Sequence, residues 1–136
     1  MTDLLDSVEV LAGRRSADER GWLHVALGGS QLPATARFGE LYVVRGEAGV
    51  RRGDHLHRRM DEWFTVVDGA AELQLLDPAT GARLTLTLAA DRPQTVRVPA
   101  GLAHCLVGGP HGFVATAWAT AEHDPGDSIP CSTAAE

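Results

Sequence analysis

The chain alternates between short apolar stretches and clusters of glycine, proline and polar residues of the kind that form turns. In residues 83–88 leucine and threonine alternate strictly, which predicts a strand with its leucines facing a core and its threonines facing solvent. Residues 72–75 show the same two-residue period. Many short strands separated by turns indicate an all-β sandwich or barrel.

The same pattern predicts strands at 8–11, 22–27, 40–45, 52–57, 62–67, 71–76, 83–88, 95–98, 103–107 and 113–120. Asp68-Gly69, between two of these strands, indicates a tight hairpin. A helix fits only in the first fifteen residues or at 16–20, and neither segment has a clear helical period. Residues from 124 onward are expected to lie along the barrel surface or to fray.

A length of 136 residues suits one domain with a substantial core. We expect a single domain over 1–136, with a core barrel at about 18–120 and a C-terminal tail at 121–136. The apolar content of 44% excludes a disordered chain. The sequence has no apolar run of membrane-spanning length and no signal-peptide pattern at its start, so we expect a cytoplasmic protein with no membrane partner.

The net charge is −6, and all 12 basic residues are arginine. An acidic chain without a long basic run argues against a nucleic-acid partner. The pairs Arg51-Arg52 and Arg58-Arg59 form a local cation cluster that suits a small anionic ligand, unless they only form a solvated loop edge. Two cysteines, Cys105 and Cys131, do not make a disulfide framework.

The chemistry-bearing residues begin in a segment that reads Gly49, five residues, His55, one residue, His57, four residues, Glu62, six residues, Gly69. Histidines at i and i+2 of a strand point to the same face. Glu62 begins the returning strand, where antiparallel neighbours lie about 5 Å apart, so it can face His57. A second segment, Pro99-Ala100-Gly101-Leu102-Ala103-His104, brings a third imidazole from far along the chain.

Three neutral imidazole nitrogens and one carboxylate suit a divalent transition metal such as Zn, Fe(II), Ni, Mn or Cu. A carboxylate among core-facing residues is costly unless it is paired or ligates a metal. We therefore predict His55, His57, Glu62 and His104 as metal ligands, with open positions for water or substrate. The alternative is a metal-free protein that uses its histidines for packing or acid–base work.

Both segments resemble those of the cupins, which implies a single-domain cupin jelly-roll barrel of antiparallel strands. Within the cupins, residues 18–127 are most similar to the WxcM-like sugar 3,4-ketoisomerases and to the cupin domain of capsular-polysaccharide enzymes. The similarity rests on Arg20-Gly21-x-Leu23, on Tyr42, on residues 49–57 and on a late Asp124-Pro125-Gly126-Asp127. It implies an isomerase or epimerase acting by proton transfer next to a carbonyl, on a nucleotide-sugar or similar small metabolite.

The resemblance also implies roles for individual residues. Position 62 is typically Gln in the ketoisomerases, which need no metal, so Glu62 favours the metal-binding type. With a metal, Tyr42 is a candidate catalytic acid or base and Arg52 contacts an anion or the substrate. Without a metal, His55 or His57 takes the proton next to the carbonyl.

Other activities fit the same ligand set. They are an Fe(II) cupin dioxygenase, a zinc cupin tailoring enzyme of the polyketide-cyclase type, and a non-catalytic small-molecule-binding cupin. Homodimers are common among cupins and exposed β edges favour pairing, so we expect a homodimer.

Overall fold

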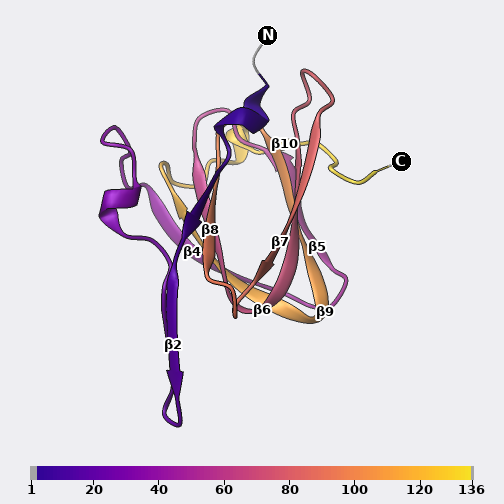
Figure 1. Ribbon diagram of the computed structural model, residues 1–136. Helices are drawn as coiled ribbons and strands as arrows, with labels where there is room; N and C mark the ends of the chain where they lie inside the picture. The colour runs from indigo at the N-terminus through magenta and orange to yellow at the C-terminus, as the bar shows by residue number, and fades with distance from the viewer. Residues whose placement is uncertain (1–2, 136) are drawn as a thin grey trace.

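The computed structural model describes residues 3–135, so residues 1–2 and 136, at the ends of the predicted domain, lie outside it. The protein is all-β and antiparallel, which confirms the predicted fold class (Figure 1). The only helical segments described are three short 3₁₀ turns, η1 (Leu4–Ser7), η2 (Gly29–Gln31) and η3 (Pro125–Asp127). None of the described helices is long and apolar enough to cross a membrane.

The strands, in chain order, are β1 (Glu9–Ala12), β2 (Arg14–Asp18), β3 (Gly21–Val25), β4 (Glu40–Gly46), β5 (Arg51–Leu56), β6 (Glu62–Leu76), β7 (Arg83–Ala89), β8 (Gln94–Val98), β9 (Ala103–Ala119) and β10 (Ile129–Pro130). Two of them, β6 and β9, pair with each other along most of their length. The first part of β6 also pairs with β8 and its second part with β7. The first part of β9 also pairs with β5 and its second part with β4.

These pairings fold one antiparallel sheet into two layers that share β6 and β9. Figure 1 shows β4 and β8 on one side and β5 and β7 on the other. Side chains from both layers fill the space between them, and the largest buried ones include Phe64, Leu73, Val96, Leu106 and Phe113. This layered arrangement is the predicted cupin jelly roll, and it leaves the inward-facing ends of β4, β5, β6 and β9 beside one another.

The predicted hairpin at Asp68-Gly69 is wrong, because β6 continues through it as one strand. Bulges at Val66–Asp68 and Gly69–Ala71 bend β6 where β9 also bends. Gly69 and Gly112 both have positive φ, of 70° and 72°, and a side chain at Gly69 would collide with the Gly112 carbonyl oxygen. The predicted strands at 103–107 and 113–120 likewise belong to one strand, β9.

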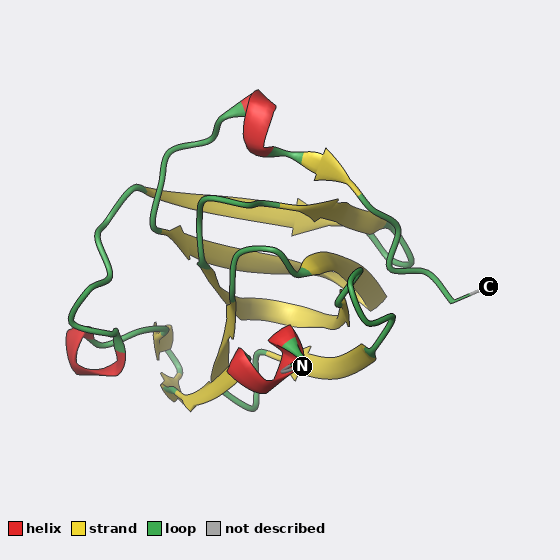
Figure 2. Cartoon of the chain, turned by 90° about the horizontal axis from the view of Figure 1, so that it is seen from above, coloured by secondary structure: helices red, strands yellow, loops and turns green. Residues whose placement is uncertain are grey.

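Two elements were not predicted. The segment 16–20, one of the two places where a helix fitted, lies largely in β2, which forms a separate hairpin with β3 that projects from the barrel (Figure 1). The tail follows the first of its two expected courses, along the barrel. Figure 2 shows it crossing from the end of β9 to β10, which pairs with Leu56 and His55 of β5.

Candidate active site

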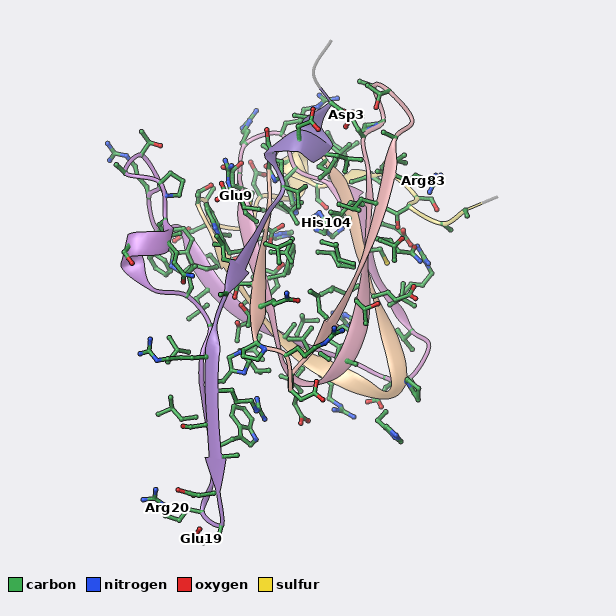
Figure 3. All side chains as sticks on the ribbon, in the orientation of Figure 1. Asp3, Glu9, Glu19, Arg20, Arg83 and His104 are labelled. Atoms are coloured by element: carbon green, nitrogen blue, oxygen red, sulfur yellow. The ribbon has the colours of Figure 1, made fainter. Side chains whose placement is uncertain are left out.

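Three imidazoles meet between the two layers. His55 lies near the end of β5, His57 follows that strand directly, and His104 is the second residue of β9. His55 is the cross-strand partner of His104, and their ring centroids are 4.9 Å apart. One ring nitrogen from each of the three histidines lies within 4.8 Å of the others. Figure 3 shows His104 inside the barrel, between the layers.

Glu62, the first residue of β6, brings a carboxylate to these imidazoles and is only 2% exposed. Its Oε1 atom lies 3.3 Å from His57 Nε2 and 3.6 Å from His104 Nε2. Its Oε2 atom accepts a 2.6 Å hydrogen bond from the Tyr42 hydroxyl on β4. The structure thus gathers the three predicted histidine ligands into one cluster and places Glu62 against two of them, His57 and His104, and against the predicted acid–base tyrosine.

The electrostatics keep this carboxylate ionised. Burial by itself raises the pKa of Glu62, but the contact with His57, the neighbouring His104 and the hydrogen bond from Tyr42 outweigh it, so that pKa is lowered. Burial and the neighbouring Glu62 charge raise the pKa of Tyr42, so its hydroxyl keeps its proton. Tyr42 is therefore a donor at neutral pH.

The three imidazoles differ in charge because their surroundings differ. Burial lowers the pKa of His104 to about 4, and burial together with the His57 charge lowers the pKa of His55. Burial also disfavours protonated His57, but the contact with the Glu62 carboxylate and the hydrogen bond to the Asp127 carbonyl outweigh it and raise the pKa of His57. At neutral pH, His55 and His104 therefore present neutral nitrogens, whereas His57 pairs with the ionised Glu62.

The tail orients His57. The His57 Nδ1 atom donates to the Asp127 carbonyl oxygen over 3.1 Å, which directs Nε2 toward Glu62. The Asp127 carboxylate, itself buried, accepts from the backbone N–H groups of Arg58 and Arg59 and so fixes the turn before Glu62. The sequence pattern indicated Asp127 only as part of a family resemblance, because its partners lie about seventy positions earlier.

The residues present fit a divalent metal. Glu62 Oε1 is buried and has no hydrogen-bond partner within residues 3–135, although it faces two imidazole nitrogens. Its 3.3 Å and 3.6 Å separations from those nitrogens match ligand atoms around one ion, which lie about 3.3 Å apart in a tetrahedral zinc site. A histidine that binds a metal through one ring nitrogen usually donates its other ring N–H to a carbonyl or carboxylate, as His57 Nδ1 does here.

Two adjoining cavities open on this cluster and share Tyr42 and His55. The Arg52 cavity, of about 110 Å³, is lined by Tyr42, Val44, Arg52, Gly53, His55, Phe64, His104 and Leu106. The Glu62 cavity, of about 350 Å³, is lined by Glu40, Tyr42, His55, His57, Met60, Glu62 and His123. The combination of apolar walls, an arginine and acid–base groups suits a small polar metabolite with an anionic part.

Sequence reasoning predicted some of these lining residues and missed others. Arg52 lines its cavity as expected, whereas Arg51 of the predicted cation cluster binds Asp54 and Thr133 and is engaged away from the imidazoles. His123 and Glu40 lie at the rim, where the His123 backbone N–H donates to Glu40. Local pattern could not place His123 there, because its position depends on the path of the tail.

The chain resembles several solved structures. A dTDP-sugar isomerase from Desulfovibrio desulfuricans superimposes with a TM-score of 0.84 at 20% identity, covering 99% of this chain and 90% of that one. A 3,4-ketoisomerase from Helicobacter canadensis gives 0.74 at 18% identity, covering 90% and 89%. The dTDP-6-deoxy-D-glucose-3,5-epimerase of Legionella pneumophila gives 0.79 at 19% identity, covering 92% and 72%. At these identities the likeness establishes the fold.

No curated protein matches the chain by sequence. The family model described as the polysaccharide biosynthesis C-terminal domain matches residues 16–128, which is most of the chain. This match and the shared fold confirm the predicted resemblance to cupin sugar isomerases and epimerases. The chain therefore belongs to the polysaccharide biosynthesis C-terminal domain family and has the cupin-like fold of sugar epimerases and isomerases.

Proposed function

We propose that this protein is an isomerase or epimerase that moves a proton next to the carbonyl group of a nucleotide-linked keto-sugar. The observation that carries the proposal is the series Tyr42–Glu62–His57 on the wall of a cavity, with His55 beside it: Tyr42 donates a hydrogen bond to one Glu62 oxygen, and the other lies 3.3 Å from His57 Nε2. It offers a neutral acid and a neutral base within one pocket, which is what enolisation of a carbonyl compound requires.

The nucleotide-sugar part of the proposal is supported by the structural relatives. The Legionella pneumophila epimerase was solved with dTDP-4-keto-L-rhamnose, and a Bacillus anthracis dTDP-4-dehydrorhamnose 3,5-epimerase with TDP and pyrophosphate. In this chain the Arg52 guanidinium is the cavity-lining cation suited to an oxyanion or a sugar phosphate.

We further propose that a divalent metal assists the reaction, held by His55, His57, His104 and Glu62. When bound, such an ion supplies Lewis-acid polarisation of the keto oxygen and stabilises the enediolate. Tyr42 would then donate a proton to the enediolate carbon, because its hydroxyl borders both cavities and its raised pKa keeps it protonated. With every imidazole held as a ligand, water in the cavity would carry away the proton that leaves the substrate carbon. Glu62 orients that hydroxyl by accepting its hydrogen bond.

The protonation of the imidazoles sets a choice between two routes. As metal ligands they must be neutral and cannot also accept a proton from the substrate. In the metal-free protein His55 becomes the base, since its lowered pKa leaves a free nitrogen at neutral pH next to the Arg52 cavity. Both routes use Arg52 to steady negative charge, and they differ in whether metal changes the rate.

The test is proton exchange on a keto-sugar nucleotide. The protein is incubated with dTDP-4-keto-L-rhamnose in D₂O, and deuterium at the carbons next to the carbonyl is followed by NMR. Metal-stripped protein is compared with protein reloaded with Zn, Mn, Ni or Fe(II), the last under exclusion of air. We expect exchange that reloading accelerates. Absence of exchange in every sample would overturn the function. Oxygen consumption by a separate portion of the Fe(II) form, exposed to air together with the keto-sugar, would indicate a dioxygenase instead.

A further inference from the structure

The pairing of β5 with β9 contains one extra residue next to the site. Arg52 lies opposite Leu106 and Gly53 opposite Cys105, and the next pair is His55 with His104. Asp54 has no counterpart on β9, so it forms a β-bulge between Gly53 and His55.

The bulge decides which face His55 occupies. Side chains alternate along a strand, so a regular continuation would place Asp54 opposite His104 and turn His55 to the outside of the barrel. The extra residue shifts this alternation by one position. Arg52 and His55, three positions apart, therefore line the same cavity together with His104.

This geometry requires an unfavourable backbone conformation at Asp54. Its φ is 59°, and within residues 3–135 it is the only residue other than glycine with a positive φ. Aspartate adopts this left-handed region more readily than most residues, but it still needs support from its surroundings. The preceding residue, Gly53, also has a positive φ, of 130°, so two consecutive residues leave the ordinary strand conformation at the bulge.

The C-terminal tail supplies that support. The Asp54 carbonyl oxygen accepts a 2.8 Å hydrogen bond from the Cys131 N–H. The Asp54 Oδ1 atom accepts two further hydrogen bonds, from the N–H and from the hydroxyl of Thr133, each over 2.9 Å. Thr133 is only 3% exposed, and its carbonyl oxygen accepts from Arg83 of β7 over 2.6 Å. The far end of the chain thus binds the strained residue from two sides.

We propose that residues 131–133 form a latch that holds Asp54 in its bulge and thereby keeps His55 aimed at His104. Thr133 and Asp54 are positioning residues, since they act on the site only through the backbone of β5. The latch makes the tail part of the active site, although it contributes no lining side chain from 131–133. The expected effect of the latch on the reaction rate rests on the proposed function, whereas its effect on the position of His55 does not.

Two substitutions of Asp54 test whether the latch acts by supporting the positive φ of this residue. Asp54→Ala and Asp54→Gly both remove the carboxylate that Thr133 binds, but only glycine accepts a positive φ without strain. We expect the nuclear Overhauser effect between the His55 and His104 ring protons to be lost in Asp54→Ala and retained in Asp54→Gly. Equal NMR signals in both variants would overturn the proposal.

A second set of variants changes Thr133 in the unsubstituted protein and in the Asp54→Gly protein. It gives a result even if the Asp54→Ala protein does not fold. Thr133→Val alone should weaken the same NMR contact and slow deuterium exchange on the keto-sugar about tenfold, whereas Thr133→Ser should leave both within twofold. In the Asp54→Gly background Thr133→Val should have no further effect. An equal loss in both backgrounds would mean that Thr133 serves folding in general and would refute the latch.

The NMR contact keeps this test separate from the proposed function. If the unsubstituted protein exchanges no deuterium, the proposed function fails while the comparison of His55–His104 contacts still decides on the latch. If exchange occurs but the contact is indifferent to Asp54 and Thr133, only the latch fails. Thr87→Val, the same change at an exposed threonine of β7 outside the latch, is the matched control.

Discussion

The Tyr42 hydroxyl donates a 2.6 Å hydrogen bond to the Glu62 carboxylate, which in turn contacts His57 at 3.3 Å. Tyr42 comes from β4 and Glu62 from β6, two strands that do not pair with each other but both pair with β9. The bond therefore crosses over β9 within one layer of the barrel and fixes the direction in which Tyr42 presents its proton. The other oxygen of the same buried carboxylate faces His57 and His104.

Replacing Tyr42 with phenylalanine should abolish proton transfer but spare the metal site. Tyr42→Phe removes only the hydroxyl, so we expect the rate of deuterium exchange to fall about 100-fold or more, in line with the loss of a general acid. Metal content per chain should stay the same, because Glu62 Oε1 is unaffected. Exchange kinetics and elemental analysis check both parts, and a near-normal rate would remove Tyr42 from the mechanism.

Metal binding should depend on Glu62 and His104 together. Glu62→Ala and His104→Ala each delete one donor, so we expect bound metal in protein reloaded with zinc to fall at least about tenfold. Glu40→Gln, at the rim carboxylate, is the control and should bind as the unsubstituted protein does. Unchanged stoichiometry in both ligand variants would refute the assignment.

Gly53 should tolerate no side chain. A Cβ there would lie 2.6 Å from the His104 carbonyl oxygen, and its φ of 130° disfavours any other residue. We expect Gly53→Ala to lower the free energy of unfolding by about 3 kcal/mol, from strain and overpacking combined. Gly29→Ala, where a Cβ meets nothing within 4 Å, should change it by less than about 0.5 kcal/mol. Urea denaturation distinguishes these outcomes.

The Asp77 carboxylate should contribute to the free energy of unfolding at neutral pH and lose that contribution in acid. Its carboxylate accepts from the Leu4 N–H at 3.0 Å and the Ala79 N–H at 3.0 Å, and the Leu4 bond in particular lowers the pKa of Asp77. A carboxyl whose pKa is lower when folded contributes fully above its unfolded pKa of about 3.9, and this contribution is lost as the pH falls through the folded value. The gap in urea midpoint between the unsubstituted protein and Asp77→Asn should therefore be larger at pH 7 than at pH 3 and should narrow as the pH falls further. A constant gap would contradict this, and Asp91→Asn, at an exposed aspartate, is the control.

The homodimer stays a prediction, and β4 is the surface on which to test it. This edge strand pairs only with β9 among the described strands, and it leaves Leu41 59% and Val43 67% exposed. We expect light scattering to report a dimer and Val43→Glu to convert it to a monomer. Thr85→Glu, on the exposed side of β7, should leave the dimer intact. A monomeric unsubstituted protein would end this interpretation.

The sequence by itself determined the fold class and the chemical content of the site. The alternation in residues 83–88 predicted β7 almost to the residue, because strand period is a local property of the chain. The His55-x-His57 spacing, the return at Glu62 and the turn before His104 predicted which side chains would meet. The strand period, the histidine spacing and the turns can be recognised in the sequence because each depends only on residues a few positions apart.

Only the tertiary structure decided how those side chains are held. Glycine serves a tight hairpin and a bent strand equally well, so the run through Gly69 could not reveal that β6 continues. The bulge at Asp54 follows from its register against β9 and its bonds to Thr133, seventy-nine positions later. Hydrogen bonds between such distant residues leave no period in the sequence, because they form only after the strands have packed.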